Sequence, residues 1–279
     1  MKVELLVAAI FSALLATLAI TELTPFDRLA EWRAKLKTQK SATVDFRNFE
    51  VWDKANGEEP FLTIEFLGGE HFWNPQVAIW LEDSVGNYLV TLSVTTTAAK
   101  GLFYAGRTAK NFRQFDGKKE AGGEEVRRVD ALPYWSHKRS ILLADGFYSP
   151  SPQQPLPDAI TSATPRGNFV FKTGKLKEVL STFRVMVELN VAFDENEYFS
   201  EYDYPDDSLY HGGAGLLGQP SLIYGATIQK ESAHKHYILD LLGRGHHSGR
   251  TGELIKDLSP ITTATKIADR ITATVNFPN

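Results

Sequence analysis

Short runs in which apolar and polar residues alternate follow one another from about residue 41 to the end of the chain. Alternation with a period of two is typical of β-strands. In this part of the chain, helices are expected only at 108–115 and 259–268, so strands and helices do not alternate. This order favours an antiparallel β-sandwich over a parallel sheet. The expected strands are 44–52, 61–67, 76–82, 88–95, 169–171, 182–193, 221–229, 236–242 and 271–277. A glycine-containing hairpin turn is expected at 83–87, between the strands 76–82 and 88–95.

The composition limits the chemistry that the chain can carry. Hydrophobic residues make up 43% of the 279 residues, which is enough for a core without covalent staples. The chain has no cysteine, so disulfides, thiolate metal sites and iron–sulfur clusters are excluded. The formal net charge of −4 provides no general attraction to nucleic acid, which is therefore not expected as a partner.

Residues 1–23 predict a membrane anchor. Residues 5–21 carry no charge, and a helix of that length is about 25 Å long, at the short end of what spans a bilayer. A cleaved signal peptide is one alternative, but residues 17–19 lack the usual pattern of small residues. A buried core helix is the other alternative. We therefore expect a single-pass protein held in the membrane bilayer.

Residues 24–40 predict an amphipathic helix. Thr24 is suited to the N-cap and Pro25 to the first helical position. Apolar side chains, Trp32 among them, then recur at near-helical spacing. The helix either packs on its own domain or lies at the membrane interface, where Trp32 would contact headgroups or a partner.

The segment 158–164, Asp-Ala-Ile-Thr-Ser-Ala-Thr, has two interpretations. Its Asp and Thr side chains are suited to capping a tight turn before Pro165. The segment also resembles the acceptor motif of proteins flavinylated by ApbE-type transferases, with Asp158, Thr161 and Thr164 at fixed positions of that motif. The resemblance implies FMN attached covalently to Thr164 through a phosphoester.

A wider part of the chain, about residues 76–229, resembles the DUF2271 family of predicted periplasmic proteins. The resemblance implies a small extracytoplasmic β-sandwich, and it does not imply an enzymatic activity. This chain departs from the family by a longer N-terminal part, an insertion at 194–218 and a C-terminal extension. The resembling segments are Val-Ala-Ile-Trp-Leu-Glu-Asp at 77–83 with Gly86, Leu-Ser-Val at 92–94, Lys-Asn-Phe-Arg-Gln-Phe at 110–115, the segment 158–164, and Phe-Arg-Val-Met-Val-Glu-Leu-Asn at 183–190.

Four histidines are candidate ligands of a Zn or Cu ion. His234 and His236 alternate, so a strand would place both on one face. His246 and His247 lie in the glycine-rich stretch 243–252. Imidazole suits both metals, and the alternative is that all four are ordinary surface residues.

The insertion at 194–218 is acidic and aromatic. Between Val185 and Gln229 there is no Lys or Arg, and eight acids occur. Tyr198, Tyr202 and Tyr204 are candidate anchors for a basic partner. A solvated loop pinned by its aromatic residues is the alternative, and a calcium site is a third, although the spacing fits no EF-hand.

Signatures of catalysis are missing from the sequence. It has no Gly-x-Ser-x-Gly elbow, P-loop or His-Glu-x-x-His motif. Ser136 and His137 with Asp130 or Asp145 show no spacing that indicates a triad. We therefore predict a non-enzymatic, membrane-anchored accessory or scaffolding subunit, with one extracytoplasmic β-sandwich domain at 41–279 and membrane protein partners. The alternative is a flavoprotein electron carrier with FMN on Thr164.

Overall fold

The computed structural model describes residues 51–53, 61–101, 103, 128–157, 160–174, 181–200, 202–210, 218–232 and 235–277. These residues all belong to one compact unit, Phe46–Asn279. The predicted anchor at 1–23, the amphipathic helix at 24–40 and the helix at 108–115 lie outside the described residues. Within the described part of the chain, no helix is both long and apolar enough to span a membrane.

The first of two sheets has five strands in the order β1-β6-β2-β11-β9. Its neighbouring strands are antiparallel except for the parallel pair β1–β6. The strands are β1 (Val51–Asp53), β6 (Phe169–Thr173), β2 (Leu62–Gly68), β11 (Ala268–Val275) and β9 (His236–Ile238).

The second sheet has six strands in the order β10-β8-β7-β3-β4-β5. It is antiparallel except for the short parallel pair β4–β5. The strands are β10 (Asp240–Arg244), β8 (Leu222–Gln229), β7 (Thr182–Asn190), β3 (Gln76–Asp83), β4 (Tyr88–Thr95) and β5 (Thr161–Ser162).

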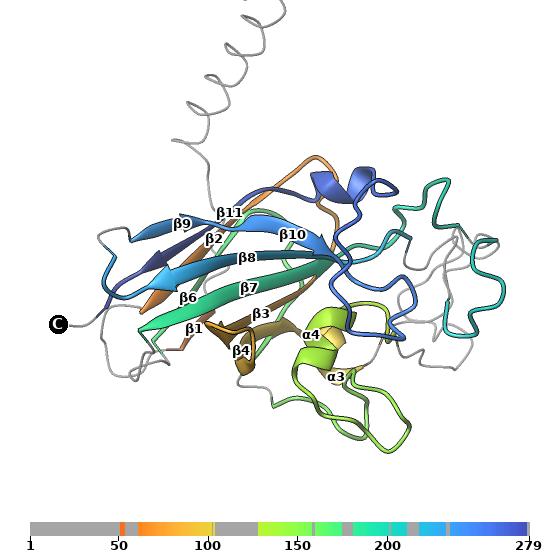
Figure 1. Cartoon of the computed structure of the whole chain (residues 1–279), viewed down its shortest axis with the longest axis horizontal. Helices are drawn as coiled ribbons and strands as arrows, with labels where there is room; N and C mark the ends of the chain where they lie inside the picture. Colours follow the sequence, from red (N-terminus) through yellow and green to blue (C-terminus); the bar gives the residue numbers. More distant parts are fainter. Residues whose placement is uncertain are drawn as a thin grey trace, which may run out of the picture. The chain divides into compact units, whose positions relative to one another are not determined.

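The two sheets pack into a sandwich, and the second sheet also carries helices (Figure 1). Successive side chains of β3 point to opposite faces of the second sheet. Val77 and Ile79 belong to the core between the sheets. Trp80 belongs to a second core, which it shares with α3 (Thr96–Lys100) and α4 (Pro133–Lys138). The central strands are therefore buried on both faces.

The hairpin turn expected after β3 is confirmed. The Asp83 carboxylate accepts hydrogen bonds from the backbone N–H groups of Val85 (2.9 Å) and Asn87 (2.8 Å). Gly86 has φ +91°, which a residue with a Cβ rarely adopts. This turn joins β3 and β4 as an antiparallel pair.

The expected strand at 236–242 is divided between the two sheets. It forms β9 in the first sheet and β10 in the second, with a break at Leu239. The Leu239 side chain is buried, and its N–H donates to the carbonyl of Ile271 (2.9 Å). The chain thus crosses between the sheets at one buried residue and closes this side of the sandwich.

The mainly β, largely antiparallel sandwich is confirmed, and several local expectations differ from it. The predicted helix at 259–268 is wrong except for one 3₁₀ turn, Thr263–Lys266, because β11 already begins at Ala268. The helices α3 and α4 were not expected. Both are very short, too short for a helical period to stand out in the sequence.

Candidate functional site

The glycine-rich loop after β10, residues 245–252, is held by close backbone contacts. Gly249 has φ +69°, and a Cβ there would clash with the backbone of Val129. A Cβ at Gly252 would clash with His137 of α4. Only glycine allows both approaches, so the loop follows a defined path and holds its two histidines in place.

The insertion after β7 meets this loop at the same end of the sandwich (Figure 1). We call its described residues, 194–200 and 202–210, the aromatic insertion. Tyr204 stacks on His247, with ring centroids 3.8 Å apart and planes at 15°. His247 also stacks on His246 at 4.2 Å. Tyr204 has φ +53°, a conformation that persists in a non-glycine residue only where surrounding contacts hold it.

Asp207 connects the insertion to the loop through its carboxylate. Ser248 Oγ donates to Oδ2 (2.6 Å), and Arg250 Nη2 donates to Oδ1 (2.5 Å). His247 Nε2 lies 3.4 Å from Oδ2. One ligand atom from each of Asp207, His246 and His247 lies within 4.8 Å of the other two.

The electrostatics of this cluster keep the carboxyl ionised and the imidazoles neutral at neutral pH. Burial raises the pKa of the Asp207 carboxyl, but hydrogen bonds from Ser248 and Arg250 outweigh it and hold that pKa well below its usual range. Burial lowers the pKa of His247 to about 4, helped by the neighbouring His246 and opposed by Asp207. Burial also lowers the pKa of His246. The Asp207–His247 contact is therefore not an ion pair at pH 7.

The tyrosines expected to bind a partner divide into two kinds. Tyr202 and Tyr198 are 80% and 45% exposed. Tyr204 is committed to the stack with His247 and lies 6.1 Å from the Phe199 ring. Trp32, the remaining candidate, lies outside the described residues.

We call the eight acids between Val185 and Gln229 the acidic run. Fewer of them are exposed than the sequence alone suggests. Glu188 and Asp194 are buried. Asp203 accepts bonds from the N–H and hydroxyl of Ser200, and Asp207 is bonded as above. Glu201 lies outside the described residues. The exposed acids of the run, among the described residues, are Glu195, Glu197 and Asp206.

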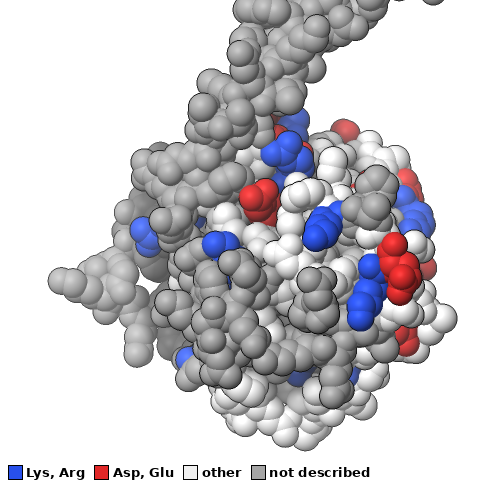
Figure 2. Space-filling view, turned by 90° about the vertical axis from the view of Figure 1, so that its left-hand side faces the viewer, with Lys and Arg blue, Asp and Glu red and all other residues white. Residues whose placement is uncertain are grey.

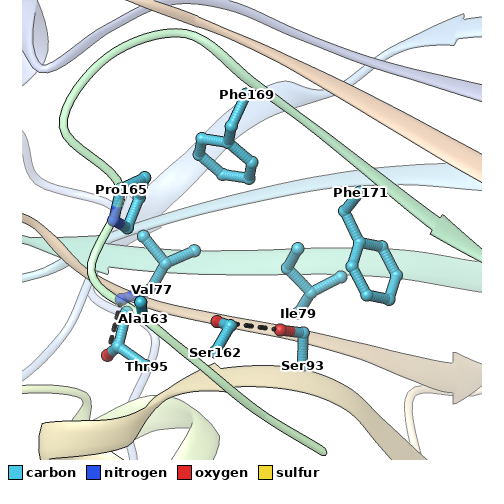
Figure 3. Close-up of a pocket in the computed structure, with 9 residues that line it drawn as sticks. All are labelled: Val77, Ile79, Ser93, Thr95, Ser162, Ala163, Pro165, Phe169 and Phe171. Atoms are coloured by element: carbon cyan, nitrogen blue, oxygen red, sulfur yellow. Dashed lines mark hydrogen bonds between the residues drawn. The ribbon is translucent and has the colours of Figure 1, made fainter. Parts of the chain in front are cut away.

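The flavinylation-like segment packs against an edge of the second sheet. Thr161 and Ser162 form β5 beside β4. Ser93 Oγ donates to Ser162 Oγ (3.2 Å), and Thr96 Oγ1 donates to the Ser162 carbonyl (2.9 Å). Figure 3 shows Ala163 at the wall of a small cavity between the sheets. Its volume of about 10 Å³ is the space of a single water, so no flavin ring fits inside.

Thr164 follows directly after this anchored strand. Its side chain is half-buried, between the exposed Ala163 and the buried Pro165. In the described part of the chain, the turn is tied by Ser162 and Thr96, and the Thr164 hydroxyl makes no hydrogen bond there. Asp158 lies outside the described residues, so the first fixed position of the motif has no structural account.

The four candidate histidines are only partly brought together. His246 and His247 are neighbours in the loop after β10. His236 begins β9 in the other sheet, where its Nδ1 lies 2.9 Å from Thr274 Oγ1. His234 lies outside the described residues. The structure adds Asp207 to the loop pair; with 38 residues between it and His246, no local spacing could have indicated it.

Three of the residues considered for a triad, Ser136, His137 and Asp130, are buried or held by contacts within the fold. The Pro133 carbonyl lies 2.8 Å from His137 Nδ1 and orients the ring within α4. Ser136 is buried. Asp130 is buried beside Arg128, and burial raises its pKa to about 6. The ring of His137 is therefore oriented by the backbone of its own helix, and it packs 4.4 Å from the Tyr148 ring.

Two buried carboxylates that no motif indicates attach α4 to the second sheet. Glu188 of β7 accepts bonds from the N–H groups of Tyr134 (3.1 Å) and Trp135 (2.6 Å) and from Ser221 Oγ (2.5 Å). Glu82 of β3 lies 3.4 Å from Lys138 Nζ of α4 and also accepts from Arg184 Nη1 (3.0 Å) of β7. These acids hold the helix beside the glycine-rich loop.

Charged side chains of both signs lie on one face of the described part of the domain. On the face shown in Figure 2, the described basic and acidic side chains are interspersed.

No family model, no curated protein and no solved structure matches this chain. The resemblance to the DUF2271 family and the flavinylation-like motif therefore stay predictions.

Proposed function

We propose that this protein is a non-enzymatic, membrane-anchored accessory subunit whose aromatic insertion docks on a basic segment of a membrane protein partner. One observation carries the proposal: Tyr202 and Tyr198 are 80% and 45% exposed on a backbone that its own hydrogen bonds hold in place. Tyrosine is enriched at the anchor points of protein interfaces. Pre-ordered anchors lose little entropy on binding.

The backbone of the insertion is fixed at both ends. Asn196 Oδ1 accepts from the N–H groups of Tyr198 (3.0 Å) and Phe199 (3.1 Å), and its Nδ2 donates to the Pro260 carbonyl (2.8 Å). Phe199 is fully buried. Further along, Tyr204 and Asp207 bind the glycine-rich loop. The exposed Tyr198 and Tyr202 therefore lie on a surface segment whose backbone is held in place by hydrogen bonds.

Charge indicates the chemistry of the partner. Glu195, Glu197 and Asp206 are exposed on the insertion, and the sequence holds no Lys or Arg from Val185 to Gln229. A basic segment complements this surface. With three exposed acids, the contact should weaken modestly with salt, since exposed charges are screened.

Photo-crosslinking in the native membrane tests this function. A photoreactive phenylalanine analogue at position 202 or 198 is expected to crosslink one membrane protein through a Lys- or Arg-rich segment. The same analogue at position 85, where Val85 is 81% exposed in the β3–β4 turn, is the matched control and should not capture that protein.

Substitution gives the second part of the test. The double variant Tyr198→Ser and Tyr202→Ser should lose the partner in mild-detergent pull-downs, with its melting temperature close to that of the wild type. Equal crosslinking from positions 202 and 85, or full retention of the partner by the double variant, would remove the proposal.

A flavoprotein electron carrier with FMN on Thr164 is the second candidate. The observation in its favour is the position of Thr164: its neighbour Ala163 is exposed, and its hydroxyl makes no hydrogen bond among the described residues. The flavin ring would lie outside the sandwich, because the cavity beside the segment holds only about one water.

Co-expression with an exported flavin transferase distinguishes the two candidates. If Thr164 is the acceptor, the intact protein gains the mass of one FMN, and Thr164→Val abolishes the gain. Thr227→Val, at an exposed threonine of β8, is the matched control and should keep it. An unmodified wild-type protein under these conditions would exclude the flavoprotein function.

A further inference from the structure

We propose that Asp207, His246 and His247 form a binding site for a divalent transition-metal ion, with Zn²⁺ as the metal that fits best. The site joins the aromatic insertion to the glycine-rich loop. It differs from the four-histidine site expected from the sequence, because it excludes His236 and includes a carboxylate. The inference stands independently of the docking function.

The geometry is close to that of a three-ligand zinc site. The three ligand atoms lie within 4.8 Å of one another. On a tetrahedral zinc with bonds of about 2.1 Å, two ligand atoms are separated by about 3.4 Å. His247 Nε2 and Asp207 Oδ2 are 3.4 Å apart, which is long for a hydrogen bond. The pair is therefore already spaced as two ligands of one ion.

The ligand types select the class of metal. Two imidazoles and one carboxylate suit zinc and its first-row neighbours, whereas calcium and magnesium prefer sites made entirely of oxygen. Three protein ligands leave a fourth position for water or for a ligand from outside.

Surrounding contacts already orient the ligands. Arg250 binds Asp207 Oδ1, so Oδ2 faces His247. Ser248 Oγ donates to the same Oδ2. Such outer contacts hold ligands in metal sites. The glycine-rich loop fixes the two histidines, and an ion at this point would pin the insertion to the sandwich.

Titration of the full-length protein in mild detergent with Zn²⁺ tests the site. We expect one equivalent of Zn²⁺ to bind by calorimetry, with a rise in the melting temperature, since a ligand that binds only the folded state stabilises it. Ca²⁺ and Mg²⁺ should have no effect at equal concentrations. Co²⁺ in place of Zn²⁺ should give the intense visible absorption of a low-symmetry, four-coordinate ion.

Single substitutions locate the ion. His247→Gln and Asp207→Asn should each weaken Zn²⁺ binding by roughly tenfold or more. His236→Gln, at an exposed histidine of β9, is the matched control and should bind as the wild type does. Asp207→Asn keeps the shape of the side chain, so it provides a result even if His247→Gln fails to fold. Wild-type affinity in Asp207→Asn, or an equal loss in His236→Gln, would overturn the proposal, as would the absence of one-equivalent binding by the wild type.

Discussion

At the scale of single residues, Glu188 shows how one buried acid organises a helix. The first N–H groups of a helix have no partner within it, and the N-cap Leu132 provides no side-chain bond to α4. Glu188 supplies that cap from a neighbouring strand, by accepting from Tyr134 and Trp135. Burial nevertheless raises the pKa of Glu188 to about 7, against the effect of these bonds.

Stability should therefore depend on pH through Glu188. Its pKa is raised from 4.5 in the unfolded chain to about 7 in the folded protein. Between these values the folded state binds the extra proton, so the free energy of unfolding falls as pH rises through this window. Glu188→Gln removes this titration. The stability of the variant relative to the wild type should rise by on the order of 2–3 kcal/mol between pH 4.5 and pH 8.

Thermal or urea unfolding at several pH values, followed by tryptophan fluorescence, measures this difference. Groups that titrate in both proteins cancel in the comparison. If the two stability curves run parallel from pH 4.5 to 8, the Glu188 carboxyl does not titrate in this window.

At the scale of elements, α4 depends on packing for its existence. A helix of six residues is not stable alone in water. The Trp135 side chain is fully buried, its Nε1 donates to Thr91 Oγ1 (2.9 Å), and the Arg139 guanidinium lies 5.0 Å from its ring. Packing in the second core therefore stabilises this helix.

Removing the indole should expose that dependence. Trp135→Ala is expected to destabilise the protein by roughly 3–5 kcal/mol, because a large cavity opens in the second core. Leu142→Ala, at a side chain that is 58% exposed just after α4, is the control and should change stability by less than about 0.5 kcal/mol. A small effect of Trp135→Ala in thermal unfolding would mean that α4 is held mainly by its polar contacts.

At the scale of the whole molecule, the docking proposal requires that the domain stays at a membrane. Residues 5–21 are uncharged and are proposed to anchor the chain. The full-length protein should remain in membranes after a carbonate wash, and a chain lacking residues 1–23 should be released. Release of the intact full-length protein, or a mature N-terminus near residue 20, would contradict the anchor.

The sequence by itself determined several of the strands and the class of fold. Alternation at 61–67, 76–82 and 88–95 predicted β2, β3 and β4 to within about one residue, because burial on a strand repeats every two residues. The turn at Asp83–Asn87 could also be predicted from the sequence, because its hydrogen bonds join residues that are close along the chain.

Only the tertiary structure decided the candidate site and the second core. Asp207 meets His246 and His247 across a long stretch of sequence, and Glu188 caps a helix from a strand. Neither contact leaves a periodic or local signal. The acidic run had the same limit: its sequence could not distinguish the buried Glu188 from the exposed Glu197. The physical reason is that alternation records which face of an element is buried, whereas the partners of a polar side chain depend on how distant segments pack.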